Sequence, residues 1–147
     1  MIDNHKIAYR NVVSKYYQFV PEEIELAFKD FEAFLERYNY HPTGTAIFSI
    51  MSDPTDEVMT AEIFFGIEEE QFNVDSDDYV RFRSYFSVSP MLMTRVEGNI
   101  EEQAQVKYWE LIERLNHLGL EQATPVFVEY KRTHSDKSYI EMSVGYR

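Results

Sequence analysis

The sequence predicts an α+β domain built from two tandem βαββ units. Apolar residues follow strand and helix periodicities in the same order twice, an acidic stretch separates the two runs, and a Glu-x-x-x-Gly pattern stands near the end of each run. The first unit is expected over about 5–67, the linker over 68–79 and the second unit over about 80–147. A chain of 147 residues is expected to form a single domain.

The first unit opens with a loosely alternating stretch, 7–13, that suits a strand. Pro21 and the two glutamates after it predict the start of a helix over about 21–39, because proline and acidic side chains suit a first helical turn. The apolar face of this helix consists of Ile24, Phe28, Phe31, Leu35 and Tyr38. Two β-prone stretches, 45–51 and 58–67, flank an Asp-Pro-Thr-Asp turn and predict a hairpin.

The second unit repeats this order of elements. Residues 80–97 are strand-like, with a Ser-Pro pair that predicts a bulge or a strand start. Asn99 has capping-box spacing to a following glutamate and Gly119 suits the position just beyond a helix, so a helix is expected between them. A second hairpin is expected over 124–131 and 139–146.

The two units also share individual residues. In the helices, 31–39 align with 108–116 at an offset of 77 residues, and in the strands 62–66 align with 141–145 at an offset of 79. Any two amphipathic βαββ units share apolar periodicity. The shared Glu, Arg, Asn and Gly positions favour a duplication over that simpler interpretation.

Composition narrows the possible functions. There is no cysteine, which excludes disulfides, thiolate metal sites and a cysteine nucleophile. The net charge of −12 disfavours direct nucleic-acid binding, and it is compatible with a cationic ligand or a basic protein partner. The four histidines lack metal-ligand spacing, so neither a metal nor a cofactor is expected.

Catalysis and membrane insertion are also not expected. There is no Gly-x-Ser-x-Gly elbow and no glycine-rich phosphate loop, although paired carboxylates leave general acid–base chemistry open. No apolar run approaches membrane-spanning length, and the N-terminus lacks the apolar core of a signal peptide. The protein is therefore expected to be cytoplasmic, without a membrane partner.

The tandem βαββ order resembles the gyrase-inhibitor-like (GyrI-like) domain family, which is also the effector-binding module of multidrug-responsive and AraC-type transcription regulators. The residues that carry the resemblance are clearest in the second half, in 88–98 and 125–130 on either side of the helix. The resemblance implies an antiparallel arrangement of about eight strands with two long helices packed on it. It also implies a cleft between the halves, lined by aromatic residues, in which an acidic residue pairs with cationic, lipophilic ligands.

Two departures from that family and one further likeness bear on the role. The chain has Gly98-Asn99-Ile100 where the family has a Gly-x-Tyr turn, and no DNA-binding segment is recognised. It is therefore not expected to be a complete regulator. The chain also resembles small uncharacterised GyrI-like proteins of Gram-positive bacteria, some from type VII secretion toxin loci.

The resemblance, carried over residue by residue, gives a set of candidate ligand-binding residues. They are Glu129, Tyr130, Glu141, Tyr9, Tyr85, Trp109 and Glu62. Glu129 is the first candidate for the acid, because a cation held between it and aromatic rings would gain charge pairing and cation–π attraction. When the strands of the two units are aligned, Glu129 of the second unit corresponds to Ile50 of the first, so this acid is expected in one half only. The alternative is that each glutamate faces solvent or pairs with a lysine or arginine.

These observations favour a stand-alone binding protein that holds a small apolar or cationic molecule in the cleft. A protein-interaction or accessory factor with a vestigial cleft is the alternative, and its partner would be another protein. A hydrolase that uses a cleft glutamate, as some GyrI-like proteins do, is less favoured.

Overall fold

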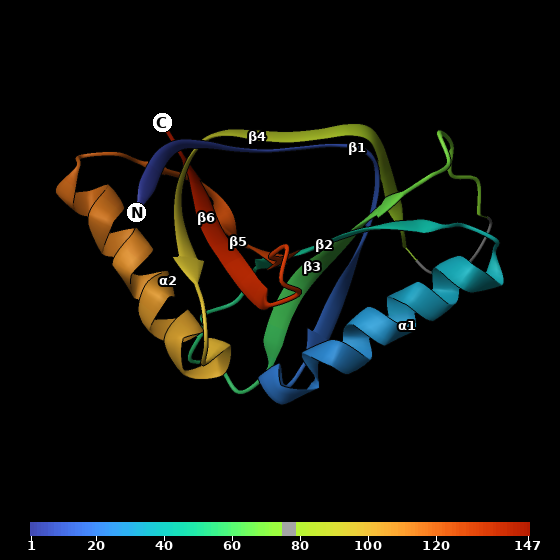
Figure 1. Ribbon diagram of the computed structural model, residues 1–147, viewed down its shortest axis with the longest axis horizontal. Helices are drawn as coiled ribbons and strands as arrows, with labels where there is room; N and C mark the ends of the chain where they lie inside the picture. The colour runs from blue at the N-terminus through green and yellow to red at the C-terminus, as the bar shows by residue number, and fades with distance from the viewer. Residues whose placement is uncertain (75–78) are drawn as a thin grey trace. The chain divides into compact units, whose positions relative to one another are not determined.

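The computed structural model describes residues 1–74 and 79–147, and in these it forms six β-strands, two α-helices and one short 3-10 helix (Figure 1). The elements are β1 Ile2–Phe19, η1 Pro21–Glu23, α1 Ile24–Arg37, β2 Pro42–Ile50, β3 Met59–Ile67, β4 Arg81–Val96, α2 Ile100–His117, β5 Gln122–Arg132 and β6 Ser138–Tyr146. The predicted α+β class and the βαββ order, met twice, are confirmed. Residues 75–78 of the expected acidic linker lie outside the described part.

The described residues contain six strands, which corrects the eight that the family resemblance implies. Two βαββ units supply six strands, and eight would require β1 and β4 each to break in two. Instead β1 has 18 residues and β4 has 16, and β4 continues through Ser89 and Pro90. Pro90 directly precedes the β4–β6 ladder, which begins at Met91, so its missing N–H removes no hydrogen bond from that ladder.

The chain divides into two compact units. Residues Ala8–Phe86 contain α1 and are called the α1 unit, and residues Met1–Ile7 with Ser87–Arg147 contain α2 and are called the α2 unit. In the α1 unit β3 pairs with β1 and β2, and in the α2 unit β6 pairs with β4 and β5, all antiparallel. Each unit therefore contains a three-stranded antiparallel sheet and one helix, and in addition the first residues of β4 lie in the α1 unit and those of β1 in the α2 unit.

An aromatic cluster joins α1 to its sheet. The Phe31 ring is fully buried, with its centroid 5.3 Å from that of Phe65 on β3 and 6.2 Å from that of Tyr17 on β1. Phe28 makes edge contacts with Phe48 on β2 and with Phe65. Such pairs add about 0.5–1.5 kcal/mol each beyond the area that they bury, so one helix face fastens all three strands.

The two helices end in the same way. Asn39 and Gly119 follow the last turns with left-handed φ angles of 62° and 70°, and the next residue donates its N–H to the carbonyl of Leu35 or Leu115 at 2.9 Å. This is the Schellman pattern, in which Gly119 holds the predicted position. The helices thus correspond at an offset of 80 residues rather than 77. A slip of three residues nearly superimposes an apolar helix face on itself, which explains the error.

The central strand of the α2 unit buries both of its faces. One face is apolar and consists of Ile140, Met142 and Val144, and the other carries Glu141, Ser143 and Gly145. Helix α2, which lies against β6 and β5, buries Leu111 and Leu115. Within the described residues, neither helix is long and apolar enough to cross a membrane.

We expect Phe31→Ala to lower the free energy of unfolding by about 3–5 kcal/mol, because it opens a cavity beneath α1. Leu26→Ala, on the exposed side of the same helix, should change it by less than about 0.5 kcal/mol. Urea denaturation followed by circular dichroism measures both. Equal losses for the two variants would contradict the assignment of the buried helix face.

Candidate functional site

Three of the candidate residues are glutamates, and the structure buries all three. Glu62 is 6% exposed, Glu129 4% and Glu141 8%. Strand alternation places Glu62 on the face of β3 opposite Phe65, and therefore away from α1. Of the two alternatives, exposure of these glutamates to solvent is wrong, whereas pairing with a lysine or arginine is what the structure shows for each of them. A buried carboxylate is costly unless it is paired, so the partners of each acid matter.

In the α2 unit, two of the acids stand side by side. Glu129 on β5 is directly opposite Glu141 on β6, and Arg95 on β4 is opposite Glu141 on the other side. These three residues are called the acid row. Like charges directly opposite one another destabilise a sheet, so the row needs compensating cations. Arg95 Nη2 lies 3.5 Å from Glu141 Oε2, and Lys131 Nζ lies 3.3 Å from Glu129 Oε2.

The cations that pair with the two acids, Arg95 and Lys131, are far more accessible than the acids themselves. The side chain of Arg95 is 49% exposed and that of Lys131 is 33% exposed. Both separations exceed the roughly 2.7–2.9 Å that is typical of charge-assisted hydrogen bonds. The guanidinium of Arg95 also lies 4.6 Å from the centre of the Tyr139 ring, which gives it a second partner. The acids are thus buried, while their counter-ions approach from the solvent side.

The face of the sheet that carries the acid row also carries apolar side chains. Met91 and Met93 lie four and two residues before Arg95 on β4, and Phe127 lies two residues before Glu129 on β5, so all three share the face of the acid row. All three are buried. Phe127 is therefore the aromatic residue on this face of β5, and sequence analysis did not select it. The strand periodicity alone contains the signal, since Phe127 and Glu129 are two residues apart.

The other aromatic candidates do not all share this setting. Tyr130, next to Glu129, points to the opposite face of β5 and is exposed. Trp109 on α2 is exposed and makes an edge contact with Tyr108 at 5.0 Å. Tyr85, near the start of β4, is exposed, and Tyr9 on β1 is half-buried.

The equivalent row in the α1 unit has a single acid. Glu62 is flanked by Tyr16 on β1 and Ser49 on β2, so Ser49 corresponds to Glu129. The sequence alignment placed Ile50 there, and the ladder corrects it by one residue. The correction matters because neighbouring residues of a strand point to opposite faces.

Glu62 is compensated differently from the acids of the α2 unit. The hydroxyl of Ser14 donates to Glu62 Oε2 at 2.7 Å, and Arg83 donates from Nη1 to Ser14 Oγ at 3.0 Å. Arg83 Nη1 lies 3.6 Å from the same carboxylate oxygen. Ser14 and Arg83 could not be predicted from the sequence, because they are separated from Glu62 and from each other by many residues and carry no local pattern.

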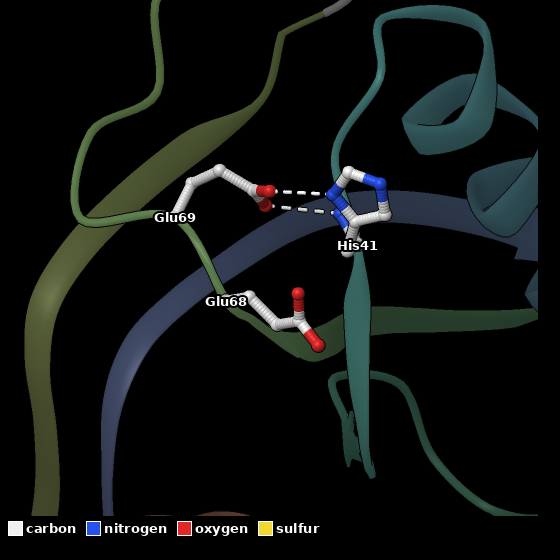
Figure 2. Close-up of side chains that lie close together, drawn as sticks. All are labelled: His41, Glu68 and Glu69. Atoms are coloured by element: carbon white, nitrogen blue, oxygen red, sulfur yellow. Dashed lines mark hydrogen bonds and ion pairs between the residues drawn. The ribbon is translucent and has the colours of Figure 1, made fainter.

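A further polar cluster lies where β2 begins and β3 has just ended. The carboxylate of Glu69 accepts hydrogen bonds from His41 Nδ1 at 2.6 Å and from the His41 backbone N–H at 2.9 Å (Figure 2). One imidazole nitrogen of His41 and one carboxylate oxygen each of Glu68 and Glu69, the atom types that bind metals, all lie within 4.8 Å of one another. The hydrogen bond to Glu69 and its charge raise the pKa of His41, and the same contact lowers the pKa of Glu69. A protonated imidazole does not bind metals, so the geometry favours an ion pair that ties the two strand ends together.

The fold that positions these residues is similar to solved structures. One is the EcmrR–DNA complex, with a TM-score of 0.72 and 11% identity, where the match covers 97% of this chain and 57% of that chain. Another is the C-terminal domain of EcmrR, with a TM-score of 0.65 and 10% identity, covering 100% and 99%. The chain thus spans little more than half of EcmrR in the complex, and at these identities the likeness shows the fold alone.

The sequence itself assigns a family. Residues 8–146 match the family described as Domain of unknown function (DUF5085), and the chain belongs to that family. No curated protein matches the sequence.

We expect the imidazole of His41 to titrate above its ordinary pKa of 6.5, and Glu69→Gln to bring that pKa down. Glu68→Gln should lower it less, because Glu68 acts through charge alone. The contribution of His41 to stability is fully present below its ordinary pKa of 6.5 and is lost as the pH rises through the raised pKa. The contribution of Glu69, whose pKa is lowered, is lost as the pH falls through that lowered pKa. NMR titration of the imidazole measures the shift, and an unchanged pKa in Glu69→Gln would disprove the pairing.

Proposed function

We propose that the chain is a GyrI-like ligand-binding domain and that its acid row takes part in holding a small cationic or apolar molecule. The observation that carries the proposal is the pair of buried carboxylates, Glu129 and Glu141, placed directly opposite each other on neighbouring strands. The resemblance of the sequence to effector-binding modules supports a binding role, and the fold likeness to the C-terminal domain of EcmrR agrees with that resemblance in fold.

The energetics of the acid row favour a cation as the ligand. Two carboxylates that are taken out of water and set opposite each other lower the stability of the sheet, and a cation that enters beside them would offset part of that cost. Arg95 pairs loosely with Glu141 and has the Tyr139 ring as a second partner. An incoming cation can therefore replace Arg95 at Glu141 while the guanidinium stays on the ring.

The apolar body of such a ligand also has suitable contacts. Met91, Met93 and Phe127 share the face of the acid row, and methionine side chains adapt readily to ligands of different shape. We propose binding without chemistry, because both acids of the acid row are engaged with cations, Glu129 with Lys131 and Glu141 with Arg95. We also propose that nucleic acid is not bound directly, since the net charge is −12.

We expect tetraphenylphosphonium, a lipophilic cation, to raise the melting temperature of the wild-type protein. A ligand at 100 times its Kd stabilises the native state by about 2.7 kcal/mol. Tetraphenylborate, an anion of similar shape, should have no such effect. Glu141→Gln should abolish the response to the cation, whereas Glu113→Gln, on the exposed side of α2, should retain it.

Differential scanning fluorimetry over a ligand series measures these shifts. A response to the cation that is identical in the wild type and in Glu141→Gln would remove the acid row from the site. The absence of a response to any lipophilic cation would overturn the proposed ligand class.

A second candidate function is protein interaction. Val106 and Trp109 stand one turn apart on α2 and both expose large apolar side chains. Exposed aromatic residues of this kind are common at the centres of protein interfaces.

Trp109 is the one tryptophan of the chain, so its fluorescence reports on this surface directly. If a second copy covers it, the emission should shift to shorter wavelength as the protein concentration rises. Val106→Asp should prevent the shift. An emission maximum that does not change with concentration, together with a monomeric sedimentation coefficient, would exclude self-association through α2.

A further inference from the structure

Glu62 of the α1 unit differs from the acids of the α2 unit because a buried cage encloses its cation. Arg83 Cζ lies 5.6 Å from the ring centres of both Phe64 and Phe86, and these two rings stack with their centres 4.9 Å apart. Ser14 and Glu62 provide the polar side of the enclosure. Ser14, Glu62, Phe64 and Phe86 are called the Arg83 cage.

The cage has the composition of a cation-recognition site. It offers one carboxylate, one hydroxyl that is already oriented by that carboxylate, and two aromatic rings. A cation placed among them gains charge pairing and attraction to the rings, and both are stronger away from water. All four cage residues are buried, whereas the side chain of Arg83 is 26% exposed. The guanidinium of Arg83 can therefore be reached from solvent, while the residues that surround it are held in place by burial.

The contact between Arg83 and the carboxylate of Glu62 does not have the geometry of a rigid structural ion pair. A tight arginine–carboxylate pair is bidentate, with two short parallel hydrogen bonds. Here the nearest approach to Glu62 is 3.6 Å, and the guanidinium donates to Ser14 instead. The short hydrogen bond, 2.7 Å, is the one from Ser14 to Glu62, and it does not depend on Arg83. Departure of the guanidinium therefore leaves the polar side of the cage assembled.

We propose that the Arg83 cage is a second cation-binding site, whose resident occupant is Arg83 and whose free ligands are guanidinium-type or compact alkylammonium cations. A free ligand binds by displacing the tethered guanidinium. This inference takes its ligand class from the proposed function, but it concerns a different acid in a different unit. Because a tethered group has an effective concentration on the order of millimolar or higher, Arg83 acts as a built-in competitor that sets a threshold for the free cation.

The variant Arg83→Ala tests the proposal, with guanidinium chloride as the probe at low millimolar concentration, far below denaturing levels. The variant should melt at a lower temperature than the wild type, and guanidinium should recover part of the loss, half-maximally in the millimolar range. Sodium chloride at equal ionic strength should recover none. The double variant Arg83→Ala/Glu62→Gln should not respond to guanidinium.

Arg81→Ala is the matched control, because Arg81 lies two residues away on β4 and is exposed. Its melting temperature should not respond to guanidinium. Absence of guanidinium-specific recovery in Arg83→Ala, or equal recovery in the double variant, would overturn the proposal.

A measurement on the wild-type protein covers the case in which Arg83→Ala does not fold. Proximity to two rings should shift the NMR signals of the Arg83 side-chain protons away from their random-coil positions. Titration with tetramethylammonium chloride should return them toward those positions and leave Arg81 unchanged. Signals that are unshifted from the start, or that do not respond, would reject the tethered occupant. Glu141→Gln should leave all these results intact, which separates this site from the acid row.

Discussion

The central strand of each unit, β3 or β6, buries both of its faces, and the rest of the structure depends on that constraint. Since side chains alternate along a pleated strand, one face packs on the helix and the other must accommodate whatever residues stand between the apolar ones. In both central strands that second face carries a glutamate, Glu62 or Glu141. A slip of one residue by a strand that carries an acid would turn that acid to the face that packs on the helix, so the pairing register fixes the sites as well as the core.

The two units satisfy the same demand in different ways. The α1 unit has one acid, held by the Ser14 hydroxyl, and its cation is enclosed by aromatic rings. The α2 unit has two acids opposite each other, and its cations, Arg95 and Lys131, are partly exposed. The two units therefore share the position of their central glutamate, while the residues on either side of it differ. The α1 unit has Ser49 beside its central glutamate, whereas the α2 unit has Glu129 at the corresponding position. This one difference doubles the number of buried carboxylates in the row of the α2 unit.

Periodicity was sufficient to predict the helices and strands, but not which residues of the two repeats correspond or which residues meet in space. The helices and hairpins follow from spacings of three, four and two, and Gly119 marks a helix end that the structure confirms. The same periodicity allowed the helix alignment to slip by three residues, because one apolar face resembles itself a turn later. Burial of the glutamates was undecidable from alternation, which shows that two faces exist but not whether both are covered. Ser14 and Arg83 reach Glu62 only through long-range pairing, which leaves no trace in local sequence.

The boundaries of the compact units do not follow the boundaries of the repeats. Residues 1–7 lie in the α2 unit, and residues 81–86 at the start of the second repeat lie in the α1 unit. The arginine that neutralises the acid of the first copy thus comes from the second copy. Either repeat, expressed alone, would lack the strand segment that the other repeat adds to its unit. The first repeat would also lack Arg83, the arginine that lies beside Glu62. The two βαββ segments are therefore interdependent, and a cut between them would separate Glu62 from Arg83.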